Sequence, residues 1–235
     1  MKRASFICAV LLLVVTAALA ADFWNSKPAT KWSAAEATRL LTDSPWAHMY
    51  TMRTATRTGR GVPGVADAQV EPQINYTVYL RSAKPIRQAK MRMAALDKKY
   101  DKMDEVSKKD FDAKWGQYVD TDSPDRVLVM VAYGSNVPDT DRQLALYFQN
   151  QTLETVASTT SLTTPDGKHV DAVGYRVGQG NSREFQLEFP RPADMPAEGS
   201  FVVEFKHPDV ADQPSRRIST KYSLKEMKYS GALVY

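Results

Sequence analysis

The segment from Val127 to Val131 constrains the fold most, because all five of its residues are apolar. A strand with one face in water alternates apolar and polar residues, whereas a strand covered on both faces reads as a continuous apolar run. We therefore expect this segment to be a central strand with protein on both sides. The chain has material for such a core, because 43% of its 235 residues are hydrophobic and 25% are charged. That composition excludes a collagenous, low-complexity or wholly disordered chain.

Several other short strands are predicted at intervals marked by turn residues. Phe185, Leu187 and Phe189 alternate with polar residues, as expected of a strand with one buried face. Pro165-Asp166-Gly167 is a hairpin-turn signal. The remaining predicted strands cover residues 75–80, 159–164, 169–177, 201–205 and 217–224. This pattern predicts an antiparallel β-sandwich-like core, of which an Ig-like fold is one form.

Helices are predicted before the strands and between two of them. Ser33 and Glu36 have the spacing of a capping box, and that helix should end before Pro45. A longer helix should begin at Pro85, and the segment 107–110 resembles a second capping box that leads into another helix. Asp141 is a candidate cap for a further helix. The long helix has an apolar stripe over five turns, formed by Ile86, Ala89, Met93, Leu96, Tyr100 and Met103. The second helix of the pair carries Phe111, Trp115 and Tyr118.

The predicted fold class is therefore α+β, with an N-terminal helix and an inserted long helix pair added to the sandwich-like core. No internal repeat or linker divides the chain, so we expect a single domain over residues 21–235. Residues 21–72 would form a Trp-rich arm and loop that pack on this domain.

Residues 1–20 have the pattern of a secretory signal peptide. Lys2 and Arg3 precede an apolar run from Phe6 to Leu19, and Ala18-Leu19-Ala20 is a small-residue cleavage site. The run is about 14 residues, shorter than the ~20 that a membrane-spanning helix needs. We expect an exported protein, periplasmic or extracellular, with no transmembrane span after removal of the signal.

Export would also remove the single cysteine, Cys8, and with it several kinds of chemistry. Disulfides, thiolate nucleophiles, thiolate zinc sites and iron–sulfur clusters all require cysteine. The formal charge of +4 falls to +2 when Lys2 and Arg3 leave, and charges of both signs are mixed along the chain. We therefore expect neither a nucleic-acid partner nor a cofactor.

The patterns expected of metal and catalytic sites are incomplete. Asp120, Asp122 and Asp125 form one acidic cluster and Asp139 and Asp141 another, but turn chemistry explains them more simply than calcium does. His48, His169 and His207 lack the spacing of paired metal ligands. Gly59 to Gly64 spells G-x-G-x-x-G, yet Pro63 lies inside it and more loop follows. Glu184, Glu188 and Glu204 occupy outward-facing positions of predicted strands.

We therefore predict no metal ligands and no catalytic residues, and the sequence favours a non-enzymatic protein. There is no G-x-S-x-G or S-x-x-K motif. Catalytic triads are recognised by geometry rather than by sequence position. The alternative is thus an envelope hydrolase whose site the fold gathers from scattered Ser, His and carboxylate residues.

Two groups of residues are candidates for ligand binding. Trp24, Trp32 and Trp46 would stack on a ligand if they are exposed, or would anchor the arm if they are buried. Arg87 and Lys90, with Lys98 and Lys102, would give the long helix a basic face for an anionic surface, or simply a solvated one.

Several short motifs are spread over nearly the whole chain after the signal pattern: Phe23-Trp24, Lys27-Pro28, Trp32-Ser33, Leu40-Leu41-Thr42-Asp43-Ser44-Pro45-Trp46, Ser82-Ala83, Pro85-Ile86-Arg87-Gln88-Ala89, Phe189-Pro190-Arg191 and Leu224-Lys225-Glu226-Met227. In these motifs the chain resembles an uncharacterised group of secreted proteins from Gram-negative soil bacteria. The resemblance implies export and this layout, and no assigned activity or site. Together with the missing catalytic motifs, it suggests a binding or structural protein whose partner is an envelope component or another protein.

Overall fold

The structure, a computed structural model, describes residues 23–53, 73–211 and 213–235. The predicted signal peptide, Cys8 and the glycine motif at 59–64 lie outside the described residues. Within the described ranges, no helix combines the length and apolarity needed to cross a membrane.

The larger sheet has five antiparallel strands, with β3 (Arg126–Ser135) between β2 (Gln73–Leu80) and β7 (Glu184–Pro190). Strand β1 (Ala47–Arg53) is one edge and β6 (Gly174–Val177) the other. The prediction of a central strand is confirmed. Its coverage differs from the prediction: the odd-numbered residues of the apolar run, 127 to 131, are fully buried, but residues 128 and 130 are only half-buried. The second face of this sheet is covered only in part.

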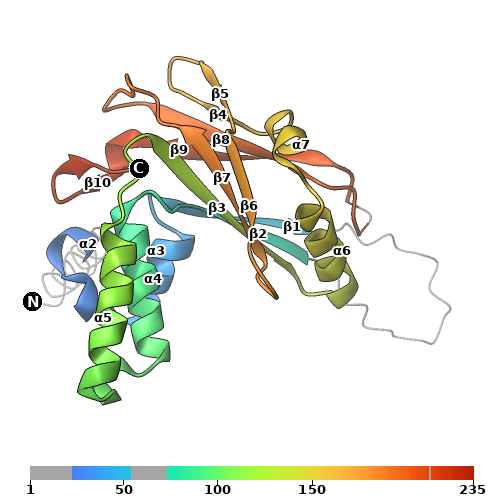
Figure 1. Ribbon diagram of the computed structural model, residues 1–235. Coiled ribbons are helices and arrows are strands. Elements are labelled where there is room, and N and C mark those ends of the chain that lie inside the picture. The colour runs from blue at the N-terminus through green and yellow to red at the C-terminus, as the bar shows by residue number, and fades with distance from the viewer. Residues whose placement is uncertain (1–22, 54–72, 212) are drawn as a thin grey trace, which may run out of the picture.

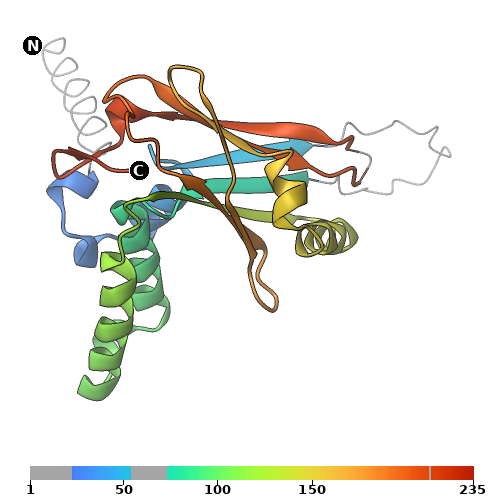
Figure 2. The ribbon, with the colours of Figure 1, turned by 45° about the horizontal axis from the view of Figure 1, so that its top comes forward.

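A second antiparallel sheet of four strands packs on the buried face of the first (Figures 1 and 2). Aromatic side chains fill the space between them: the ring centroids of Tyr76 and Phe205 lie 5.3 Å apart, and the Tyr222 hydroxyl donates to the Val78 carbonyl over 3.1 Å. The strand order of this sheet is β5 (His169–Asp171), β4 (Ser161–Thr163), β8 (Ser200–His207) and β9 (Arg216–Ser223).

The predicted hairpin turn joins β4 and β5, and Gly167 there has a positive φ of 83° that favours glycine. The predicted strand over 169–177 is not continuous. It divides at Ala172 and Val173, so that β5 pairs with β4 in one sheet and β6 pairs with β7 in the other. This crossing between sheets depends on long-range pairing, which the local sequence does not encode.

The N-terminal capping box is confirmed in helix α3 (Ala34–Thr42). The Ser33 hydroxyl accepts from the Glu36 amide at 3.2 Å, and the Glu36 carboxylate accepts from the Ser33 amide at 2.6 Å. Short elements precede and follow it in the chain: α2 (Phe23–Ser26), the 3-10 turns at Ala29–Lys31 and Leu224–Glu226, and the hairpin of β10 (Lys228–Tyr229) and β11 (Ala232–Leu233).

Helices α4 (Lys84–Asp97) and α5 (Glu105–Asp120) form the inserted pair between β2 and β3. The predicted five-turn stripe is wrong, because α4 ends at Asp97 and Lys99, two residues later, adopts a positive φ of 53°. The predicted start at Ser107 is also wrong: Asp104 caps α5, and its carboxylate accepts from the Ser107 amide at 2.9 Å.

Helix α6 (Pro138–Gln149) lies at the opposite end of the sandwich from α3, α4 and α5 (Figure 1). It starts at Pro138 rather than being capped by Asp141. Its Phe148 ring lies 4.8 Å from that of Tyr133 and 4.5 Å from that of Phe185, which closes this end of the core. The short helix α7 (Leu153–Ala157) follows. The predicted class is thus confirmed: an α+β fold with an antiparallel sandwich-like core, an N-terminal helix and an inserted helix pair.

Candidate functional site

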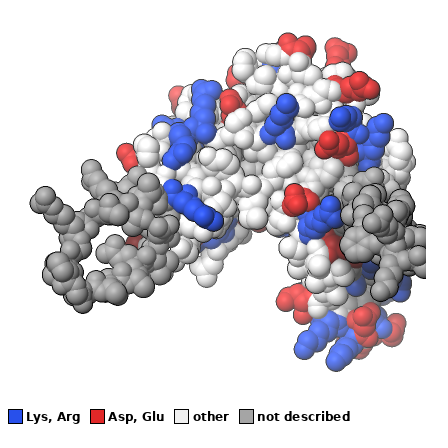
Figure 3. All heavy atoms as spheres, turned by 180° about the vertical axis from the view of Figure 1, so that it is seen from behind, with Lys and Arg blue, Asp and Glu red and all other residues white. Residues whose placement is uncertain are grey.

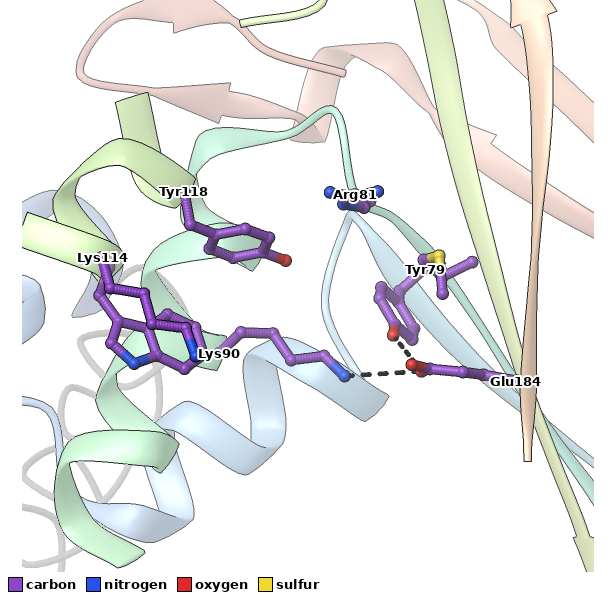
Figure 4. A pocket seen from close by; sticks show the side chains of 8 residues that line it. Tyr79, Arg81, Lys90, Lys114, Tyr118 and Glu184 are labelled. Atoms are coloured by element: carbon purple, nitrogen blue, oxygen red, sulfur yellow. Dashed lines mark hydrogen bonds and ion pairs between the residues drawn. The ribbon is translucent and has the colours of Figure 1, made fainter. Parts of the chain in front are cut away.

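A pocket of about 390 Å³ lies between the helix pair and the partly covered face of the five-stranded sheet (Figure 4). Tyr79 and Met130 are paired neighbours on β2 and β3, and they contribute to its floor. Arg81, Lys90, Lys114, Trp115, Tyr118 and Glu184 complete the lining. The pocket therefore combines three cations, one carboxylate and three aromatic rings from β2, the β2–α4 turn, α4, α5 and β7.

Glu184 is engaged by two other lining residues. Its carboxylate accepts a 3.0 Å hydrogen bond from the Tyr79 hydroxyl and lies 3.8 Å from the Lys90 ammonium (Figure 4). Lys90 also lies over the Tyr79 ring, 4.9 Å from its centroid. The negative charge of Glu184 is thus balanced by Lys90 inside the pocket.

Arg81 is held differently. One nitrogen of its guanidinium donates to the side-chain oxygen of Gln186, and the group lies 5.5 Å from the centroid of the Tyr118 ring. Gln186 is only 5% exposed, and its amide donates in turn to Glu188 over 2.9 Å. Glu188 is paired with Arg176 at 3.0 Å. Arg81 is therefore oriented by a neutral amide and a ring rather than by a carboxylate.

The tyrosine hydroxyls of the pocket are hydrogen-bond donors at neutral pH. Burial raises the pKa of Tyr79 far above its ordinary value, and the neighbouring Glu184 charge raises it further. Burial also raises the pKa of Tyr118, although the nearby Arg81 charge opposes this. Neither hydroxyl would act as a base.

Of the two basic residues singled out for ligand binding, only Lys90 lines this pocket. Arg87 is 6% exposed, and its guanidinium donates to the carbonyls of Arg81 and Ser82 and, over 2.9 Å, to that of Val119. It ties the β2–α4 turn to the end of α5. The prediction that Arg87 faces an anionic surface is therefore corrected: its side chain fixes the backbone that carries Arg81 and Tyr118. Arg87 also contributes to the lining of a neighbouring pocket.

Of the two interpretations of the helix cations, the structure favours a solvated surface over a basic binding face. Lys98 and Lys102 lie after the end of α4, and both are exposed. Basic and acidic side chains are mixed at the tip of the helix pair on the face shown in Figure 3. This mixture favours a solvated surface over a single-sign patch.

The three N-terminal tryptophans are buried, so of their two predicted roles the structure favours anchoring over ligand stacking. Trp32 and Trp46 are fully inaccessible, and Trp24 lies 5.5 Å from Trp46, ring centroid to ring centroid. The Trp46 indole donates to the Val234 carbonyl at 2.6 Å, and that of Trp32 donates to the Lys27 carbonyl at 2.9 Å. These rings anchor the arm to the core, as predicted for the case that they are buried.

The three histidines lie on three different strands. His207 on β8 is fully buried and His169 on β5 is exposed. His48 on β1 lines a second pocket of about 730 Å³ together with the carboxylates Asp43 and Glu226. Burial lowers the pKa of His48, while those two carboxylates oppose the shift. Its buried Nε2 has no hydrogen-bond partner within the described part of the chain.

The aspartate clusters are used in ion pairs and turns. Asp120 pairs with Lys84 at 3.1 Å, Asp139 with Arg142 at 2.6 Å and Asp141 with Arg183 at 2.8 Å. Asp122 accepts a 2.8 Å hydrogen bond from the amide of the next residue, Ser123. Among the residues that the structure describes, no group of three or more His, Cys, Asp or Glu side chains is arranged to hold a metal.

Sequence reasoning did not single out Tyr79, Arg81 or Glu184 as partners. The outward orientation predicted for Glu184 is correct, but the helix pair, rather than open solvent, faces that side of the sheet. Arg81 and Glu184 are about a hundred residues apart, so no local spacing signals their meeting.

No protein-family model and no curated protein matches the chain. Two solved structures show weak likeness to it. One is a protein of unknown function from Burkholderia pseudomallei K96243, with a TM-score of 0.40 and 14% identity over 62% of this chain and 73% of that one. The other is a DUF4426 family protein from Pseudomonas aeruginosa PAO1, with a TM-score of 0.30 and 12% identity over 65% of this chain and 86% of that one. Structural similarity this low does not indicate a function for this chain.

Proposed function

We propose that this chain is an exported, non-enzymatic binding protein of the cell envelope that takes a small ligand in the pocket beneath the helix pair. The main support for this proposal is the lining of the pocket, in which three aromatic rings and three cations surround a volume of about 390 Å³. Ligand sites are typically concave, largely apolar, and provided with a few oriented polar groups. The lining has no Ser, Cys or His, so it lacks the side chains that most often serve as a nucleophile or its base.

Export is supported by the secretory pattern of residues 1–20 and by the resemblance of the mature sequence to secreted proteins. It is tested by fractionating cells that express the tagged full chain and sequencing the N-terminus of the product. A product that begins near residue 21 outside the cytoplasm is expected. A full-length product in the cytoplasm would contradict the proposal.

Ligand binding is tested by thermal unfolding of the mature chain with cell-wall glycans, anionic headgroups and small aromatic acids. A ligand at 100 times its Kd adds about 2.7 kcal/mol to the free energy of unfolding, which is visible as a shift in midpoint. Trp115→Ala should remove the shift, because Trp115 lines the pocket. Val106→Ala is the matched control on the same helix, since Val106 is 72% exposed and does not line the pocket. A shift that survives in Trp115→Ala would place binding elsewhere.

A hydrolase is the second candidate, and the observation that favours it is the pocket shared by His48, Asp43 and Glu226. Ser44 also lines this pocket, but its hydroxyl donates to the Leu40 carbonyl at 2.7 Å and accepts from the Trp46 amide, so it is not directed at His48. Turnover of ester or glycoside substrates that disappears in His48→Asn would support this candidate. No turnover by the wild-type chain would leave the binding function alone.

A further inference from the structure

Within the binding pocket, one cation is fixed in place without a carboxylate partner. Glu184 is the single carboxylate of the lining, and it is already engaged by Lys90 and Tyr79. Arg81 makes no ion pair within the described part of the chain, and neither does the exposed Lys114. The lining therefore has two positive charges in excess.

Arg81 is also prepared to bind. Its contact with the buried Gln186 uses one nitrogen, and its position over the Tyr118 ring restricts the plane of the guanidinium. The Gln186 amide is held by Glu188, which is itself neutralised by Arg176. An arginine fixed in this way presents its remaining N–H groups in a fork that matches the oxygens of a carboxylate or phosphate. Less side-chain entropy is lost when such a group binds.

The rest of the lining suits an apolar body. Trp115, Tyr118 and Met130 supply aromatic and thioether surface, and the ring centroids of Trp115 and Tyr118 lie 5.4 Å apart in an edge-to-face pair. A pocket of about 390 Å³ lies near the lower end of the usual range for small-molecule sites. The ligand should therefore be a single small molecule rather than a polymer segment.

We infer that this pocket recognises a small amphipathic oxyanion, a carboxylate or phosphate carried on an aromatic or similarly flat apolar body, with Arg81 binding the anion and Lys114 adding to the attraction. The inference rests on the proposed binding function and names its ligand class. The apolar body contacts Trp115 and Met130, while Glu184 excludes a second negative charge from the Lys90 side.

The test uses three probes that share one ring system: 2-naphthoate, 2-naphthyl phosphate and the neutral 2-naphthamide. Isothermal titration of the mature chain should show at least one of the two anions binding 10-fold or more tightly than the amide. Arg81→Gln should weaken that anion by about 10- to 100-fold, the usual value of a charge-assisted hydrogen bond, and leave the amide unchanged. Lys109→Gln is the matched control, because Lys109 is exposed on α5 and does not line the pocket.

Each outcome separates the inference from the proposed function. Equal binding of anions and amide, unchanged in Arg81→Gln, would overturn the anion assignment while the pocket remained a binding site. Anion binding that Lys109→Gln weakens as much as Arg81→Gln would show a general surface-charge effect and also overturn it. If none of the three probes binds and the broader ligand panel is negative too, both the anion inference and the proposed binding function are refuted. Tighter binding of 2-naphthoate would indicate a carboxylate ligand, and tighter binding of 2-naphthyl phosphate would indicate a phosphate ligand.

Discussion

Protonation of His207 should control the acid stability of this protein. The ring is 0% exposed, its Nδ1 shares a 2.7 Å hydrogen bond with the Tyr76 hydroxyl, and its Nε2 has no partner within the described residues. Burial lowers the pKa of His207 from 6.5 to about 4; the Arg216 charge lowers it further, and Asp209 opposes the shift. The native state therefore holds this imidazole neutral at pH values where the unfolded chain would already bind a proton.

The sign and size of the effect follow from that difference. Between pH 6.5 and pH 4 the unfolded state binds up to one proton more than the native state, so the free energy of unfolding falls as the pH falls. Each pH unit costs about 1.4 kcal/mol, and the whole window is worth about 3 kcal/mol. The stability is fully present above pH 6.5 and is lost as the pH falls toward 4.

His207→Asn tests this, because an asparagine side chain can still reach the Tyr76 hydroxyl but does not titrate. Urea unfolding followed by tryptophan fluorescence would be measured from pH 7 to pH 4.5. The variant should be less stable than the wild type at pH 7, because a smaller side chain leaves a cavity. The gap between them should shrink by about 2 kcal/mol at pH 4.5. His169→Asn is the control for the same substitution at an exposed position.

Equal slopes in the wild type and in His207→Asn would refute the reasoning. That result would mean that the buried ring gains a proton without cost, or that the unfolded state does not bind one in this range. A direct titration of the His207 ring by NMR would then distinguish the two explanations.

Three further substitutions test a helix cap and two packing contacts of the fold. Ser33→Ala should destabilise the chain by about 1 kcal/mol through loss of the α3 capping box, measured by urea unfolding; no change would mean that Glu36 alone satisfies the helix end. Phe148→Ala should cost about 3–5 kcal/mol, because its ring closes one end of the core; a thermal midpoint within a degree of the wild type would contradict that role. Trp46→Phe should cost about 1–3 kcal/mol and increase amide hydrogen exchange near Val234, whose carbonyl loses its donor; unchanged exchange there would argue against the contact.

Local signals in the sequence predicted local structure correctly where a few neighbouring residues decide the outcome. The Ser33 and Glu36 box and the turn at Gly167 each depend on interactions within a few residues, and both are present. The apolar run at 127–131 identified the central strand, because a strand in the interior of a sheet is rich in apolar residues. Helix boundaries were less predictable: α4 ends at a run of lysines and α5 starts at Asp104, positions that propensity alone does not distinguish.

By itself, the sequence determined the class of the fold, the place of the inserted helix pair and the absence of cysteine from residues 21–235. Only the tertiary structure decided that the tryptophans are buried, that Arg87 serves the backbone, and that Arg81 and Glu184 line one pocket. The physical reason is the distance along the chain between the residues that interact. Caps, turns and periodicity act over a few residues, whereas strand register and the docking of α4 and α5 on the sheet bring together side chains that are far apart in the chain.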